Sequence, residues 1–77
     1  METTDAINKE RERLNNNFIY HAPKGNQQSR YENIRAQARD FAEAILLQTP
    51  ASRERSLAFT KLEEAVMWAN ASIARNE

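Results

Sequence analysis

The chain has 77 residues and a mass of 8.9 kDa, which allows one small domain. It has no cysteine and one histidine, so it offers no disulfide bond and no thiolate metal site, and we expect neither a metal nor a cofactor. Its 11 basic and 11 acidic residues cancel, which argues against a partner made of polymeric nucleic acid, and no apolar run is long enough to cross a membrane. We expect a soluble, intracellular protein that gains stability by self-association.

The first expected element is a short helix over residues 3–17, capped by Thr4. Its mixed run of charges is typical of a solvated helix face. Three apolar residues fall roughly on one stripe of this helix, which Arg11 interrupts: Ile7, Leu14 and Phe18.

The second expected helix begins at Ser29, because Ser29 and Glu32 have the spacing of a capping box. Apolar residues then recur at alternating intervals of three and four: Tyr31, Ile34, Ala38, Phe41 and Ile45. This seam predicts packing against another helix. Pro50 disfavours helical geometry at the preceding residue, so the helix should end near Gln48.

The third helix is capped by Thr49 or by Ser52 and runs to about Ala74. One broad face of it is apolar: Ala58, Phe59, Leu62, Ala65, Val66, Ala69 and Ile73. A connection of only a few residues makes the two long helices antiparallel neighbours. The sequence therefore predicts an all-α fold, an antiparallel two-helix hairpin with a short N-terminal helix. We expect residues 1–19 to form that helix and its lead-in, and residues 20–77 to form the ligand-binding hairpin of the same single domain.

A second apolar surface lies on another side of the third helix, formed by Leu57, Met67, Trp68 and Ala71. A hairpin has one inner face, so this surface predicts cover by another subunit in a compact homo-oligomer. The alternative is that Trp68 packs under the N-terminal segment.

The connection "FIYHAPKGNQQSRY", residues 18–31, differs in composition from the rest of the chain. It holds three of the six aromatic residues, the one histidine and the one glycine. A tight turn over residues 22–25 accounts for Pro23 and Gly25. It does not account for the aromatic and basic residues of the connection, which are Tyr20, His21, Lys24, Arg30 and Tyr31. A further cation, Arg35, follows them one turn into the helix.

Cations interleaved with aromatic rings are the groups that an anionic, aromatic ligand requires. Arginine and lysine neutralise phosphate oxygens, and tyrosine and histidine rings stack on bases. A bend at Gly25 lets backbone N–H groups approach an anion closely. The alternatives are that Tyr20 and Tyr31 pack at helix ends and that Lys24 is merely solvated. No catalytic constellation has a suitable spacing, so we do not expect an enzyme.

Two segments carry a resemblance to a known family: "YHAPKGNQQSRYENIR" and "SRERSLAFTKLEEAVMWANASIARN", residues 20–35 and 52–76. They resemble the bacteriophage anti-CBASS cyclic-nucleotide sponges, whose helical hairpin is shared with an anti-Thoeris sponge family. The strongest part of the resemblance is the third helix, with Leu57, Ala58, Thr60, Leu62 and Met67 at the family's spacing.

The resemblance implies a protein that acts in the cytoplasm of an infected bacterium and is not an enzyme. Such proteins form homo-oligomers, typically hexamers, and sequester cyclic di- or trinucleotides at subunit interfaces, which blunts the host's defence. In that family the dinucleotide pocket contains a Lys-Gly turn, a nearby tyrosine and a basic residue early in the following helix. The matching positions are Lys24, Gly25, Tyr20 and Arg35, with His21, Arg30 and Tyr31 added by proximity.

Two positions depart from the family pattern. Asn26 follows the Lys-Gly pair where relatives have tyrosine, so Tyr20, His21 and Tyr31 compete as the stacking residue. Phe59 precedes Thr60 where some relatives carry a basic residue linked to a trinucleotide site. Two other functions remain open: a protein–protein adaptor that docks through Leu57, Met67 and Trp68, and a small nucleic-acid binder.

Overall fold

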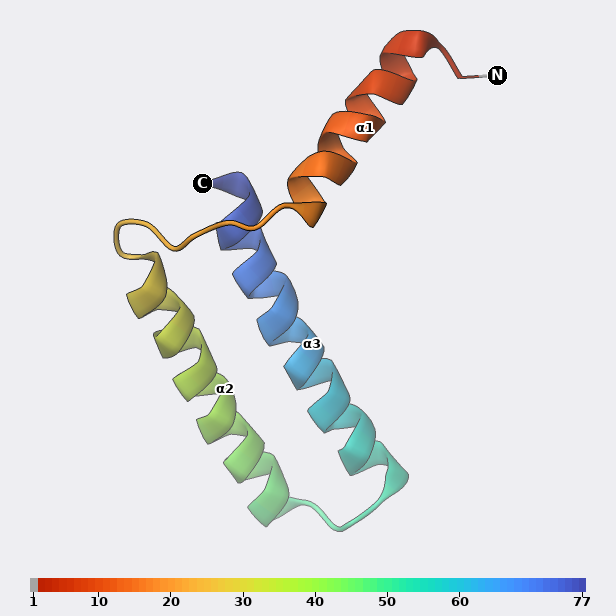
Figure 1. The fold of residues 1–77 in the computed structure, drawn as a ribbon. Helices are drawn as coiled ribbons and strands as arrows, with labels where there is room; N and C mark the ends of the chain where they lie inside the picture. Colours follow the sequence, from red (N-terminus) through yellow and green to blue (C-terminus); the bar gives the residue numbers. More distant parts are fainter. Residues whose placement is uncertain (1) are drawn as a thin grey trace.

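The computed structural model describes residues 2–77, which form three α-helices and no strand (Figure 1). These are α1 (Thr4–Phe18), α2 (Gln27–Gln48) and α3 (Arg53–Asn76). Helices α2 and α3 lie side by side and antiparallel, whereas α1 extends away from the end of this hairpin where the C-terminus lies (Figure 1). The predicted all-α hairpin with a short N-terminal helix is therefore confirmed. None of the described helices combines the length and the apolar character needed to cross a membrane.

Helix α1 begins one residue earlier than the predicted cap implies. The hydroxyl of Thr3, not that of Thr4, accepts a hydrogen bond from the backbone N–H of Ala6 at 3.1 Å, because Thr3 has an extended backbone and Thr4 is already helical. No residue of α1 is buried. Trp68 on α3 is 63% exposed, so the alternative in which the N-terminal segment covers it is wrong.

The start of α2 corrects two predictions, the Ser29 capping box and the turn over residues 22–25. The tight turn runs instead from Lys24 to Gln27, where the backbone N–H of Gln27 donates to the carbonyl of Lys24 at 3.0 Å. Gly25 makes this turn possible, because its φ of +57° is a conformation that side-chain-bearing residues rarely adopt. The turn leads directly into the helix, so Ser29 lies within the first turn and Asn26 occupies the N-cap position without a side-chain cap.

The link between the two long helices is capped on both sides. The hydroxyl of Ser52 accepts from the backbone N–H of Arg55 at 3.1 Å, which decides between the two caps predicted for α3. The Arg55 guanidinium donates to the carbonyl of Thr49 at 3.1 Å, at the C-terminus of α2, where a positive charge opposes the helix dipole. Helix α3 continues to Asn76, two residues beyond the predicted end.

The two helices meet along most of the predicted apolar positions. On α2, Ile34, Ala38 and Ile45 are half-buried, but Phe41 is 59% exposed, so its place in the predicted seam is wrong. On α3 all the predicted face positions are half-buried except Ala65, which is exposed. Phe41 and Ala65 lie outside the strip that the two helices share; on α2 this strip passes from Ala38 to Ala42 and Ile45, which are half-buried, and leaves Phe41 at its edge.

The hairpin is a single layer of helices with two open faces. The molecule measures 53 × 37 × 13 Å, and its smallest dimension is close to the diameter of one helix, about 10–12 Å. It exposes 6453 Å². A compact monomer of this mass would expose about 4,800 Å². Among the described residues no apolar side chain is buried, and the one buried residue is Gln27, at 4% exposure. Because stable domains normally pack at least two layers, this fold leaves apolar surface for a partner to cover.

Candidate functional site

A hollow beside the α1–α2 loop, which we call the loop pocket, brings together residues from all three helices. Its volume is about 390 Å³. Four of the seven predicted site residues line it, namely Tyr20, His21, Tyr31 and Arg35. The other lining residues come from the end of α1, the loop and the last two turns of α3: Asn17, Ile19, Asn70, Ala71, Ala74 and Arg75.

The loop pocket has the charge of an anion site. Arg35 and Arg75 line it from α2 and α3, and no carboxylate is among its lining residues. A guanidinium can hold two oxygens of a phosphate at once through parallel N–H groups. With no carboxylate competing among the lining groups, both cations are suited to binding an anion.

Asn70 adds a hydrogen-bond acceptor that has no partner among the described residues. Its side-chain oxygen Oδ1 is buried and receives no hydrogen bond. A buried polar atom left without a partner costs about 1–3 kcal/mol, so a rotation of the Asn70 side chain that turned Oδ1 toward a donor in the pocket would be favourable. The exocyclic amino groups and ring N–H groups of nucleobases are donors of this kind.

Hydrogen bonds from His21 and Asn16 hold the loop against the ends of α1 and α3. His21 Nε2 donates to the carbonyl of Asn16 at 2.8 Å, and the side chain of Asn16 donates to the carbonyl of Arg75 at 3.1 Å. One face of the His21 ring can still meet a ligand, because the ring is half-buried and lines the loop pocket. The loop is therefore held in place by its own polar contacts and not by an apolar core.

The two tyrosines differ in how they are presented. Tyr31 is half-buried, whereas Tyr20 is 86% exposed and has a ring free to stack. Ligand sites commonly enclose about 300–1,000 Å³, so the loop pocket lies near the lower limit of that range. Its volume suits part of a cyclic dinucleotide better than the whole molecule.

Lys24, Gly25 and Arg30 do not line the loop pocket. The backbone N–H of Lys24 donates to Oε1 of Gln27 at 3.0 Å, so this peptide N–H is occupied within the turn. The Lys24 side chain and Gly25 are exposed.

Arg30 is engaged by a carboxylate. Its Nη1 donates to Oε2 of Glu77 at 2.9 Å and its Nη2 donates to Oε1, so the pair is bidentate. Gln27 also donates to Glu77, at 3.3 Å. The hydrogen bond from Arg30, aided by the one from Gln27, lowers the pKa of Glu77, and the same bond raises the pKa of Arg30. Arg30 therefore ties the C-terminal end of α3 to the Lys24–Gln27 turn.

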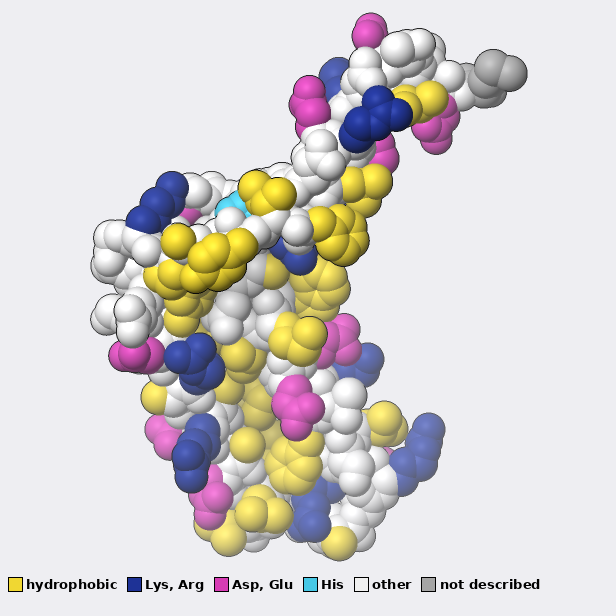
Figure 2. Space-filling view, viewed as in Figure 1, with side chains coloured by type: hydrophobic (Ala, Val, Ile, Leu, Met, Phe, Trp, Pro, Cys, Tyr) yellow, Lys and Arg dark blue, Asp and Glu magenta, His cyan; other side chains and the backbone are white. Residues whose placement is uncertain are grey.

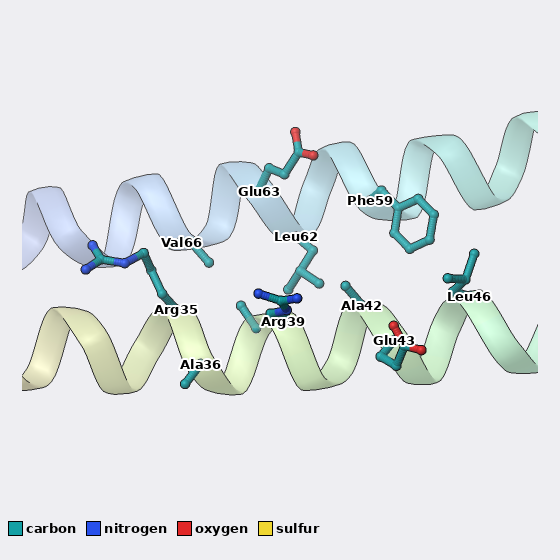
Figure 3. A pocket seen from close by; sticks show the side chains of 11 residues that line it. Arg35, Ala36, Arg39, Ala42, Glu43, Leu46, Phe59, Leu62, Glu63 and Val66 are labelled. Carbon is teal, nitrogen blue, oxygen red and sulfur yellow. The ribbon is translucent and has the colours of Figure 1, made fainter.

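A second and larger hollow, the α2–α3 groove, follows the line between the two long helices. Its volume is about 920 Å³, and apolar side chains gather between the helices (Figure 2). Figure 3 shows its lining residues. They are Arg35, Ala36, Ala38, Arg39, Ala42, Glu43 and Leu46 from α2, and Phe59, Leu62, Glu63 and Val66 from α3. Arg35 belongs to both hollows, so the groove and the loop pocket adjoin at this residue.

A comparison with protein-family models matches residues 10–74 to the hairpin domain named Acb2/Tad1. This chain belongs to the Acb2/Tad1 hairpin family. That family comprises the anti-CBASS and anti-Thoeris sponges, as the sequence resemblance predicted. The matched span contains the loop, all of α2, α3 as far as Ala74, and all residues of the loop pocket except Arg75. Searches of curated proteins and of solved structures gave no match.

The prediction of the site missed residues that lie far from the loop in sequence. Asn70 and Arg75 line the loop pocket from α3, and Asn17 lines it from the end of α1. The antiparallel hairpin places the last turns of α3 beside the first turns of α2. The predicted hairpin therefore already implied that residues near the end of α3 lie close to the loop. Asn70 also interrupts an apolar helix face, which marks it as a polar residue with a possible role.

Proposed function

We propose that this Acb2/Tad1-family chain binds and sequesters cyclic oligonucleotide second messengers and acts without catalysis. The ligands are cyclic di- or trinucleotides. By holding these messengers in the cytoplasm of an infected bacterium, the phage protein keeps them from the effectors of CBASS-type defence. The observation that carries the proposal is the loop pocket, where Arg35, Arg75, Tyr20 and Tyr31 converge without a carboxylate.

Each part of such a ligand has a counterpart in the loop pocket. The phosphates bind Arg35 and Arg75. A base stacks on Tyr20, His21 or Tyr31, which contributes about 1–3 kcal/mol per base. The amino group of that base donates to Asn70 Oδ1 once the Asn70 side chain turns toward the pocket.

We propose that the complete site lies between subunits of a homo-oligomer, a hexamer as in the family. A cyclic dinucleotide has two bases and two phosphates, whereas the volume of the loop pocket lies near the lower limit for ligand sites. A second copy supplies the rest. In that arrangement Lys24, Gly25 and Arg30 contact the ligand from the edge of the pocket and not from its floor.

Titration calorimetry with a panel of cyclic di- and trinucleotides tests the proposal directly. We expect Arg35→Ala to weaken cyclic dinucleotide binding about 10- to 150-fold, because a charge-assisted hydrogen bond contributes about 1.5–3 kcal/mol. Arg53→Ala is the matched control, because Arg53 is an exposed arginine that lines neither hollow. Lys24→Ala should weaken binding less than Arg35→Ala.

Light scattering on each variant must show an unchanged assembly for these effects to count as effects on the site. If the wild-type chain binds no member of the panel at tens of micromolar, the sponge proposal is wrong. A monomeric wild-type chain with Leu57, Met67 and Trp68 free would favour the adaptor alternative, because these side chains are 42, 69 and 63% exposed.

A further inference from the structure

Helix α1 carries an apolar stripe that the described residues of its own chain leave exposed. Ile7, Leu14 and Phe18 are 41, 43 and 84% exposed, and no residue of the helix is buried. A free helix of 15 residues is marginal in water even when its sequence favours helix. This helix therefore requires a surface that covers its stripe.

The α2–α3 groove has the length and the floor that this stripe requires. On α2 the groove runs from Arg35 to Leu46, and the stripe on α1 runs from Ile7 to Phe18. At a rise of about 1.5 Å per residue each of these spans is about 17 Å long. Small and branched apolar side chains form the floor, among them Ala38, Ala42, Leu62 and Val66.

The charges beside the stripe complement those on the rims of the groove. Arg35, Arg39 and Glu43 line the α2 side, and Glu63 lines the α3 side (Figure 3). At about 100° per residue, Glu10 and Arg11 lie on opposite sides of the centre of the α1 stripe, and Arg11, which interrupts the stripe, is the nearer of the two to that centre. When α1 lies in the groove parallel to α2, Glu10 faces the arginines and Arg11 faces Glu63. In the reverse direction Glu10 would face the rim that carries Glu63, and Arg11 would lie beside Glu43, so only the parallel direction gives both charges an opposite partner.

The α1 that fills the groove belongs to another copy. Within one chain, Asn16 donates to the carbonyl of Arg75 and accepts from His21, and with these bonds in place α1 points away from its own hairpin (Figure 1). Folding α1 back onto its own groove would break both bonds. The α1 of a second copy can enter the groove without disturbing either of them.

We propose that the α2–α3 groove is the docking surface for helix α1 of a second copy, with α1 parallel to α2. Since Arg35 lines both hollows, the docked helix adjoins the loop pocket, and its N-terminal end lies nearest Arg35. The Glu10–Arg13 pair of the free helix is fully exposed, so giving up part of it for the groove costs little. The proposal concerns assembly and stands whether or not the loop pocket binds a nucleotide.

Engineered cysteines test the docking register, because the chain has no cysteine of its own. In the parallel register Leu14 lies over Ala42. We expect the double variant Leu14→Cys/Ala42→Cys to form intermolecular disulfides on mild oxidation, seen as dimers and larger species on a non-reducing denaturing gel. The control pair Leu14→Cys/Lys61→Cys uses an exposed α3 residue outside the groove and should give far less cross-linking. Equal cross-linking by both pairs, or a disulfide that closes within one chain at every concentration, would overturn the proposal.

Charge reversal tests the predicted contact across the acidic rim. We expect Arg11→Glu and Glu63→Arg each to shift sedimentation-velocity profiles toward smaller species, and the double variant to restore much of the wild-type distribution. Circular dichroism of each variant verifies that the helices remain folded. A wild-type chain that sediments as a monomer, single variants that assemble normally, or a double variant no better than the singles would each contradict the docking.

Discussion

Replacing Gly25 with L-alanine isolates the contribution of the Lys24–Gln27 turn to stability. Gly25 has a φ of +57°, and a Cβ added there would meet no atom within 4 Å. The substitution therefore creates no clash, and its whole cost is the backbone strain of an L-residue at positive φ, about 1–2 kcal/mol. For a domain of this size each kcal/mol lowers the melting temperature by about 4–8 °C.

The matched control is D-alanine at the same position, introduced by chemical synthesis. D-Alanine adds the same methyl group but favours positive φ, so its melting curve, followed by circular dichroism at 222 nm, should match or exceed that of the wild type. Equal losses for the two enantiomers would mean that the methyl group itself is disruptive. An L-alanine variant as stable as the wild type would show that the turn does not hold this geometry in solution.

Three further outcomes follow from particular contacts. The hydrogen bond from Arg30 lowers the pKa of Glu77. The ion pair therefore stabilises the fold fully at pH values above the ordinary pKa of a glutamate, and this stabilisation is lost as the pH falls through the lowered pKa. The melting temperatures of the wild type and Glu77→Gln should differ at neutral pH and converge in acid. Ser52→Ala removes the cap on the N–H of Arg55 and should lower the unfolding free energy by about 1 kcal/mol in a denaturant titration. The emission maximum of Trp68 should move to shorter wavelength as the protein concentration rises, because a second copy covers its exposed side chain. An emission maximum that stays at long wavelength would mean that no second copy covers this residue.

The hairpin could be predicted because its signals are local. Pro50 and Ser52 mark the link between the long helices, and apolar residues at intervals of three and four mark the faces that meet. The errors arise where two local signals compete. Ser29 and Glu32 have the spacing of a capping box, but Gly25 allows a tight turn that starts α2 two residues earlier.

The loop pocket could be predicted only in part because its second half comes from the other end of the chain. Tyr20, Tyr31 and Arg35 are marked by composition close to the loop, whereas Asn70 and Arg75 join them only through the antiparallel pairing. The role of Glu77 was equally hidden. Nothing local shows that its carboxylate engages Arg30, one of the cations expected to face a ligand.

The position of Arg35 links assembly to ligand binding. It lines both the loop pocket and the groove, so a helix docked in the groove lies beside any anion held in the pocket. If the assembled state binds a cyclic nucleotide more tightly than the single chain does, the ligand must strengthen assembly by the same factor, because the coupling between two equilibria is reciprocal. The open, single-layer hairpin is suited to this coupling, because none of its described apolar side chains is buried within the single chain, so a second copy that covered them would add stability.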